Sequence, residues 1–116
     1  MKKSNIAFIV IVVLLIVGVS VVMTVPFSNT NYDDFAQCLT DEGAVLYGAY
    51  WCHNCDNQKA MFGGSVGKLN YIECIENEAI CNAKGITGYP TWIINDQKYV
   101  GTQSLETLAS VTGCSI

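Results

Sequence analysis

The sequence predicts an α/β domain with a mixed sheet flanked by helices, preceded by one N-terminal transmembrane helix. Three observations support this fold class. Strand-like and helix-like patterns alternate from residue 31 onward, two short apolar runs near the C-terminus pair as a hairpin, and a Cys-x-x-Cys motif lies where a strand gives way to a helix. A chain of 116 residues holds one such domain at most.

The composition excludes two broad classes of protein. Apolar residues make up 51% of the chain, which excludes intrinsic disorder because disordered chains are poor in apolar residues. The formal net charge is −4 and the chain contains no arginine, so no nucleic-acid partner is expected. The apolar excess is concentrated in residues 6–25, where 17 of 20 residues are apolar.

The segment Ile6–Val25 has the length of a transmembrane anchor. Lys2 and Lys3 precede it, so the positive-inside rule places residues 1–5 in the cytoplasm. The linker at residues 26–30 and the domain at residues 31–116 then lie outside the cytoplasm, held at the cell membrane. A cleaved signal peptide is the alternative, disfavoured by the length of the apolar segment and by the lack of a small-x-small cleavage site.

The first helix of the domain is predicted from the helical spacing of its apolar residues. Asn31 caps this helix and Gly43 ends it. The apolar run Ala44–Tyr50 then predicts a buried strand. The apolar residues at positions i, i+3, i+4 and i+7 of the helix are Tyr32, Phe35, Ala36 and Leu39.

The middle of the domain continues the alternation. Residues 52–62 predict a helix that stops at Gly63 and Gly64. The segment Asn70–Cys74 predicts a second strand, and Asn77–Lys84 predicts a short helix. Because strands alternate with helices here, the pairing between the first two strands is expected to be parallel.

The C-terminal part closes the domain with a hairpin and a helix. Thr91–Ile94 and Lys98–Val100 predict two antiparallel strands joined by a turn at Asn95–Gln97. Ser104 caps a last helix with Leu105, Leu108 and Ala109 on one face. The antiparallel hairpin makes the predicted sheet mixed.

Cys52 and Cys55 are the candidate redox pair, because they lie one helical turn apart at a strand-to-helix junction. At a helix N-terminus, free N–H groups and the helix dipole favour the thiolate, which is the nucleophile in disulfide exchange. Cys52 is expected to be exposed and to attack first, and Cys55 to resolve the mixed disulfide. A structural disulfide or half of a zinc site is the alternative interpretation.

Three residues next to this pair are assigned to tuning its redox properties. His53 is the only histidine of the chain, and an imidazolium beside a thiolate stabilises it. Trp51 and Asn54 complete the motif and receive the same assignment. A second motif is Gly88-Tyr89-Pro90-Thr91, whose proline precedes an apolar strand and predicts a turn in either the cis or the trans form.

The region Phe35–Ile116 resembles the thioredoxin-like domain attached to bacterial and archaeal homologues of vitamin K epoxide reductase. This resemblance covers essentially the whole domain. It is carried by FAQCL at 35–39, YGAYWC at 47–52, GITGYPTW at 85–92, KYVG at 98–101 and SLETLA at 104–109.

The resemblance implies a thioredoxin fold with Cys52 and Cys55 as the redox pair. It also implies a cis Tyr89–Pro90 bond facing that pair, where the backbone next to the proline, at Tyr89, Pro90 and Thr91, pairs with a bound substrate chain. In this family the domain passes electrons from substrate thiols to a membrane-embedded quinone-reducing part.

This chain departs from the family in two respects. The family commonly has Pro-His between the active cysteines where this chain has His53 and Asn54, so the redox potential does not carry over. The quinone-reducing helices are not found in the sequence, so a separate membrane partner is expected. The strand Ala44–Tyr50 also lacks the buried acid that serves cytosolic thioredoxins as a proton acceptor.

The other four cysteines allow three pairings if Cys52 and Cys55 pair with each other. We favour Cys74–Cys81, because the two residues are neighbours in sequence, and this leaves Cys38–Cys114. Six cysteines in a small exported domain are typical of bracing disulfides. A second redox relay at Cys74 and Cys81 is the functional alternative.

The function expected from these observations is a membrane-anchored, extracytoplasmic thiol–disulfide oxidoreductase acting on exported proteins that contain cysteines. The same site could run as an oxidase, a reductase or an isomerase, and it needs no cofactor and is assigned no metal ion. Two alternatives remain open. One is a thioredoxin-like copper-binding module using Cys52, His53 and Cys55, and the other is a structural adaptor with inert cysteines.

Overall fold

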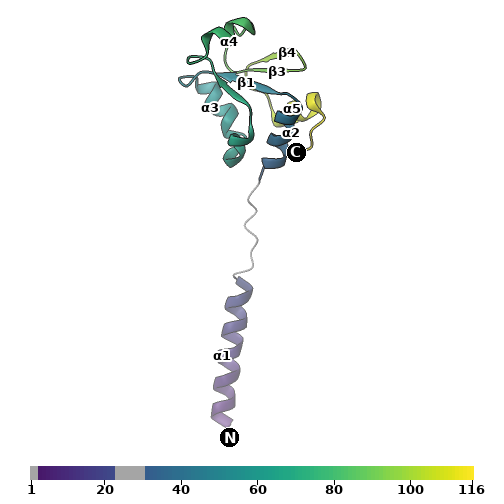
Figure 1. Ribbon diagram of the computed structural model, residues 1–116. Helices are drawn as coiled ribbons and strands as arrows, with labels where there is room; N and C mark the ends of the chain where they lie inside the picture. Colours follow the sequence, from purple (N-terminus) through teal and green to yellow (C-terminus); the bar gives the residue numbers. More distant parts are fainter. Residues whose placement is uncertain (1–2, 23–30) are drawn as a thin grey trace. The chain divides into compact units, whose positions relative to one another are not determined.

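The computed structural model describes residues 3–22 and 31–116 and divides the chain into two units, Met1–Thr30 and Asn31–Ile116 (Figure 1). In the first unit, α1 spans Lys3–Val22. No helix among the described residues combines the length and the apolar character required to cross a membrane. The predicted transmembrane helix therefore finds no support in the structure. Residues 23–25 of that prediction, and the predicted linker at 26–30, lie outside the described residues.

The second unit contains every element that the sequence predicts for the domain, in the predicted order. A four-stranded sheet has the strand order β2-β1-β3-β4. The helices are α2 (Asp33–Asp41), α3 (His53–Ala60), the 3-10 helix η1 (Gly63–Lys68), α4 (Glu78–Ala83) and α5 (Leu105–Thr112). The strands are β1 (Val45–Gly48), β2 (Tyr71–Glu73), β3 (Thr91–Ile94) and β4 (Gln97–Val100).

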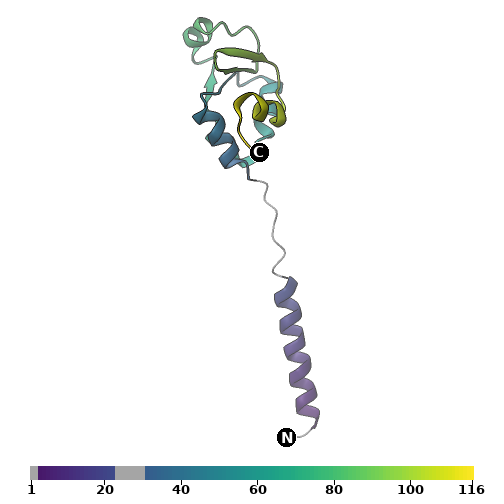
Figure 2. The same cartoon turned by 90° about the vertical axis from the view of Figure 1, so that its right-hand side faces the viewer.

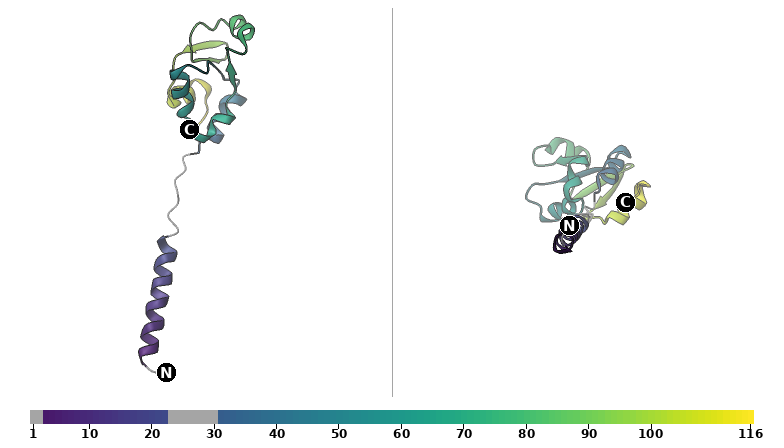
Figure 3. Two further views of the ribbon diagram at one scale, coloured as in Figure 1. Left: turned by 90° about the vertical axis from the view of Figure 1, so that its left-hand side faces the viewer. Right: turned by 90° about the horizontal axis from the view of Figure 1, so that it is seen from below.

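The sheet is mixed, as predicted. Strand β1 pairs with β2 in parallel, and β3 pairs with both β1 and β4 in antiparallel orientation. The parallel pair follows from the helical crossover through α3, and the antiparallel pair from the short hairpin. Figures 2 and 3 show the sheet and its helices from the two sides. This arrangement fits a thioredoxin-like fold.

The two faces of the sheet carry separate apolar cores, because successive side chains of a strand point to opposite faces. On one face, Leu46, Trp92 and Ile94 pack with residues of α2 and α5 and with Phe62. On the other face, Tyr47 packs with Cys74 and Cys81. Figure 1 shows α4 on this second side of the sheet and α2, α3 and α5 on the first.

Local sequence accounts for the ends of the helices. The Asn31 side chain accepts a hydrogen bond from the Asp33 N–H at 2.8 Å, and Ser104 accepts one from the Thr107 N–H at 3.1 Å. Both contacts satisfy N–H groups that a helix leaves free at its start. Ser104 is thus the N-cap of α5, as predicted. The prediction for α2 is wrong by one residue, because its N-cap is Tyr32, which makes no side-chain cap hydrogen bond, and Asn31 lies just before it.

One local prediction is incomplete and another is wrong. The helix α3 ends before Gly63 and Gly64, as predicted, but these glycines also open the 3-10 helix η1, which was not predicted. The hairpin turn contains two residues instead of three, because Asn95 and Asp96 both adopt left-handed backbone conformations, with φ of 50° and 62°. Asparagine and aspartate tolerate this conformation better than other side chains, and two such residues close a tight antiparallel turn.

Candidate redox site

The site begins at Cys52, which is the N-cap residue of α3 and has an extended backbone. Its Sγ atom accepts a hydrogen bond from the backbone N–H of Cys55 at 3.1 Å. An N–H group directed at a sulfur, at the positive end of a helix, stabilises the thiolate form. The strand-to-helix junction thus places the first sulfur where a nucleophile is favoured.

The two sulfurs differ in burial, and one expectation needs correction. The Cys52 side chain is 6% exposed and Cys55 is fully buried at 0%. Cys52 was expected to be exposed, but it packs with Ala49 and Tyr89 in a small apolar cluster. It remains the more exposed of the pair, so an incoming sulfur still reaches Cys52 before Cys55.

Burial raises the pKa of Cys55 to about 12, and the hydrogen bond with Cys52 acts in the same direction. The backbone of Ala49 and the positive charge of Lys59 oppose this effect without cancelling it. Both cysteines are free thiols in this structure. In the reduced protein, Cys55 is therefore a neutral thiol at neutral pH and must lose a proton before it attacks.

The residues assigned to tuning lie around the first turn of α3. His53 and Asn54 are exposed, and the Asn54 carbonyl accepts a hydrogen bond from the Thr102 hydroxyl at 3.3 Å. Trp51 is 62% exposed and contacts Tyr89 edge to face, with ring centroids 5.8 Å apart. The structure thus brings Trp51 and Tyr89 together at the surface next to Cys52.

The Tyr89–Pro90 bond is cis. Tyr89 is half-buried and packs against the cluster that contains both active cysteines. Thr91 is 1% exposed, and its hydroxyl donates a hydrogen bond to the Gly88 carbonyl at 2.7 Å. The Thr91 side chain therefore serves the fold, and the expected backbone pairing of a substrate chain next to Pro90 stays a prediction.

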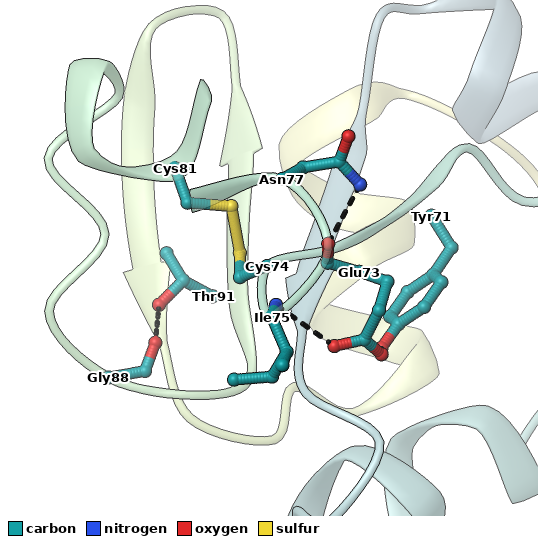
Figure 4. Close-up of a disulfide and its surroundings, with 8 residues drawn as sticks. All are labelled: Tyr71, Glu73, Cys74, Ile75, Asn77, Cys81, Gly88 and Thr91. Carbon is teal, nitrogen blue, oxygen red and sulfur yellow. Dashed lines mark hydrogen bonds between the residues drawn. A yellow bond between two sulfur atoms is a disulfide. The ribbon is translucent and has the colours of Figure 1, made fainter. Parts of the chain in front are cut away.

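The four remaining cysteines form two disulfides, Cys38–Cys114 and Cys74–Cys81. This is the pairing that the sequence analysis favoured. Cys74 follows β2 and Cys81 belongs to α4, so the short bridge joins a strand end to the next helix (Figure 4). Cys38 belongs to α2, and its bridge attaches this helix to the segment after α5.

Sequence reasoning missed two polar side chains behind the redox pair. The Tyr71 hydroxyl donates a hydrogen bond to Glu73 Oε2 at 2.9 Å, as Figure 4 shows from the side of the disulfide. The Lys59 Nζ lies 3.6 Å from the centre of the Tyr71 ring. The available signal was the two-residue spacing of Tyr71 and Glu73, which places both on one face of a strand.

The structure gives no arrangement for a metal ion in the part of the chain that it describes. Within residues 3–22 and 31–116, no group of three or more His, Cys, Asp or Glu side chains is placed to hold one.

Comparisons with known proteins point to thiol chemistry. The chain is 42% identical over 90 residues to the thiol-disulfide oxidoreductase LTO1 of Arabidopsis thaliana, an alignment that covers 70% of this chain and 24% of the relative. It is 31% identical over 84 residues to the protein disulfide isomerase-like 2-2 of Oryza sativa subsp. japonica, covering 60% of this chain and 23% of the relative. No family model matches the sequence.

The chain thus spans about a quarter of the length of the curated relatives that it matches. The names of both relatives describe enzymes of thiol–disulfide chemistry. The mixed sheet fits a thioredoxin-like fold, and the comparisons and the free thiol pair point to thiol–disulfide chemistry.

Proposed function

We propose that this chain is a membrane-anchored, extracytoplasmic thiol–disulfide oxidoreductase that exchanges disulfides with cysteine-containing exported proteins through Cys52 and Cys55. The observation that carries the proposal is the hydrogen bond from the Cys55 N–H to Cys52 Sγ at the start of α3. It favours a nucleophilic sulfur at Cys52, with a second free thiol three residues away and more deeply buried.

The reaction follows from the order of burial. With the pair oxidised, a substrate thiolate attacks Cys52 Sγ, the Cys52–Cys55 bond breaks, and a mixed disulfide forms at Cys52. A second substrate thiolate then attacks the substrate sulfur of that bond and releases Cys52 as a thiolate. The substrate has lost two electrons as a new disulfide, and the pair has gained them as a dithiol.

The surface beside Cys52 supports a polypeptide substrate. Trp51 and Tyr50 are 62% and 70% exposed, which is unusual for large aromatic side chains that have no partner surface. They adjoin Cys52 in sequence, and Trp51 contacts Tyr89 next to the cis Pro90. An extended chain lying across these residues would bring its cysteine to Cys52.

The proposals for the membrane location and for the partner are based on the sequence. The apolar segment Ile6–Val25 with Lys2 and Lys3 before it supports an anchor that leaves the domain outside the cytoplasm. The resemblance to the domain fused to vitamin K epoxide reductase homologues supports a separate quinone-reducing membrane protein as the electron acceptor. The reduction potential of the Cys52–Cys55 pair, measured against glutathione, determines whether oxidation of substrates is favoured.

Trapping of mixed disulfides tests the enzyme. A Cys55→Ser variant of the full chain, expressed in its native membrane and quenched with an alkylating agent, is expected to accumulate adducts that a reductant releases. The matched Cys52→Ser variant is expected to accumulate none, because the attacking sulfur is gone. Absence of adducts in both variants contradicts the proposal, and adducts confined to the soluble fraction contradict the anchor.

A further inference from the structure

Two hydrogen-bonded polar residues of the sheet, Tyr71 and Glu73, lie next to the redox site. They have no part in the reaction described above. Tyr71 and Glu73 lie on β2, next to β1, and Glu73 is in register with Gly48. Both side chains are half-buried. The Tyr71 hydroxyl donates to one carboxylate oxygen of Glu73, and the Ile75 N–H donates to the other at 3.2 Å (Figure 4).

Gly48 leaves the space in which this pair approaches the redox site. A Cβ atom at position 48 would lie 2.9 Å from the Tyr71 hydroxyl oxygen and 3.0 Å from Cys55 Sγ. The hydroxyl and the thiol therefore border the same small space, which glycine leaves open by lacking a Cβ atom. Two groups that border one such space can exchange a proton through one bridging water or after a small rotation of the Cys55 thiol.

Cys55 needs a proton acceptor because of its burial. Only a thiolate attacks a disulfide, and burial raises the pKa of Cys55 far above neutrality. The first core strand offers no acid for this purpose, since β1 consists of Val45, Leu46, Tyr47 and Gly48. Lys59 is the cation that acts on Cys55, and it lowers the pKa of the thiol without being able to accept a proton while charged.

We propose that Tyr71 and Glu73 form a proton relay for Cys55, in which Glu73 is the terminal acceptor and the Tyr71 hydroxyl is the intermediate carrier. The relay serves the resolving step of the disulfide exchange, so it rests on the proposed function. Glu73 replaces, from the neighbouring strand, the buried acid that β1 lacks.

The step balances in atoms and charge. In the mixed disulfide at Cys52, the Cys55 thiol proton passes to the Tyr71 oxygen as the Tyr71 proton passes to Glu73 Oε2. The Cys55 thiolate attacks Cys52 Sγ, the Cys52–Cys55 bond forms, and the bond from Cys52 to the partner sulfur breaks. The partner leaves as a thiolate with the electron pair, and Glu73 is left as a neutral acid.

The reverse direction uses the same three groups. When a substrate thiolate attacks Cys52 of the oxidised pair, Cys55 is released as a buried thiolate. Protonated Glu73 returns its proton through Tyr71, and the buried charge disappears. Burial and the contact with Glu73 raise the pKa of Tyr71, so the hydroxyl stays protonated and acts as a carrier rather than as a base.

The competing explanation is structural, since the same hydrogen bond also fixes Tyr71 against β2. Lys59 Nζ lies over the Tyr71 ring, and this contact does not depend on the hydroxyl. A Tyr71→Phe variant therefore keeps the ring in place and removes only the carrier. A Glu73→Gln variant keeps an acceptor oxygen for the Ile75 N–H and removes only the base.

Single-turnover kinetics of the reduced full chain with dithiobis(nitrobenzoate), an aromatic disulfide that releases a coloured thiolate, separate the two steps. The first release reports attack by Cys52 and speeds up with reagent concentration. The second reports displacement by Cys55 and does not depend on that concentration. In Tyr71→Phe and Glu73→Gln, the second release at neutral pH is expected to slow about 100-fold, the usual range of a lost acid–base group, and the first to change less than about twofold.

Three comparisons exclude a merely structural effect. Formate or imidazole added as a small external base is expected to accelerate the second release in Glu73→Gln and to leave the wild type unchanged. Glu73→Asp, which keeps the carboxylate, is expected to recover part of the rate. The matched variants Glu76→Gln and Tyr99→Phe, which alter an exposed acid and a tyrosine of β4, are expected to behave like the wild type.

The outcomes are distinct. A second release that is unchanged in both variants overturns the relay, and so does a slowed release that no external base accelerates. Loss of the first release in the wild type contradicts the proposed function itself. If Glu73→Gln loses its folded circular-dichroism spectrum, Tyr71→Phe and Glu73→Asp carry the test, and wild-type second-release rates in both overturn the relay.

Discussion

The two cysteines of the redox site have different surroundings. Cys52 Sγ accepts a hydrogen bond from the Cys55 N–H, whereas Cys55 is fully buried and stays protonated. This difference fixes the order of events, because the buried Cys55 thiol must lose a proton before it can attack. The difference arises from three residues of sequence that carry the chain from the N-cap of α3 into its first turn.

The pH dependence of the potential follows from the raised pKa of Cys55. Below a pH of about 12, reduction of the disulfide takes up at least one proton, at Cys55. The reduction potential is therefore expected to fall by at least about 30 mV for each pH unit from about pH 6 to about pH 10, since one proton and two electrons are exchanged. Redox titration against glutathione over this range gives the slope, and a flatter slope above about pH 9 contradicts the buried, protonated state of Cys55.

The stability of the reduced protein is also expected to fall as the pH rises, because of the same raised pKa of Cys55. The folded-state pKa of Cys55 lies above its ordinary value, so the contribution of this thiol to the stability of the reduced protein is complete at neutral pH. It is lost as the pH rises through the interval between the ordinary and the raised value. A Cys55→Ala variant lacks this thiol, so the difference in pH dependence between the variant and the wild type isolates the contribution of Cys55.

Several residue-level assignments could be made from the sequence, and others could not. The strand-to-helix junction and the three-residue spacing are local, so they identified Cys52 and Cys55 directly. The burial of Cys52 and the internal use of the Thr91 hydroxyl depend on contacts with distant segments, which no local pattern contains. Tyr71 and Glu73 were missed for the same reason, because the register of β1 and β2 brings Tyr71 close to Cys55, and Glu73 follows through its hydrogen bond with Tyr71.

The elements of the fold are linked by one buried polar side chain. Gln58 of α3 is fully buried, and its Oε1 accepts hydrogen bonds from Trp92 Nε1 at 3.0 Å and from the Gln103 N–H at 2.7 Å. Its Nε2 donates to the Gln103 carbonyl at 3.0 Å. One amide thereby joins the redox helix to β3 and to the segment before α5.

Loss of this amide is expected to be costly. Gln58→Leu preserves most of the volume and leaves the Trp92 N–H and the Gln103 backbone groups buried without partners, so the free energy of unfolding is expected to fall by about 2–4 kcal/mol. Urea unfolding of the variant measures the change. The matched variant Asn57→Leu alters an exposed neighbour on the same helix and is expected to change stability by less than about 1 kcal/mol.

The order and type of the elements in the domain were predictable because their signals are local. Alternating apolar patterns, the Ser104 cap and the glycines that end helices each act over a few residues. The 3-10 helix η1 was not predicted, since two adjacent glycines indicate a break and its contacts with α2 are long-range. Residue counting alone could not separate a two-residue from a three-residue turn at Asn95 and Asp96.

Across the whole domain, the two structural disulfides act over different lengths of chain. Cys38–Cys114 joins residues 76 positions apart, and Cys74–Cys81 joins residues 7 apart. The first connects α2 to the end of the chain, so it encloses the sheet and the redox pair within one covalent loop. The second constrains only the passage from β2 to α4.

Removal of each bridge is expected to have unequal effects. In a chain-entropy treatment, the Cys38→Ala/Cys114→Ala variant loses about 4–5 kcal/mol of stability and the Cys74→Ala/Cys81→Ala variant about 2–3 kcal/mol. Denaturant unfolding of both double variants under oxidising conditions gives the comparison. Equal losses, or a larger loss for the short bridge, contradict a dominant role of loop closure.

Gly48 has a consequence for how this sequence can vary. Its backbone is not in the left-handed region that usually requires glycine, and its place in a strand would ordinarily suit a branched side chain. Glycine is needed there for volume, because the space above it belongs to the Tyr71 hydroxyl and to Cys55. The chemistry of the neighbouring site thereby limits the size of the side chain at this strand position. A redesign of the redox pair must keep glycine at position 48 or move the Tyr71 hydroxyl and the Cys55 sulfur.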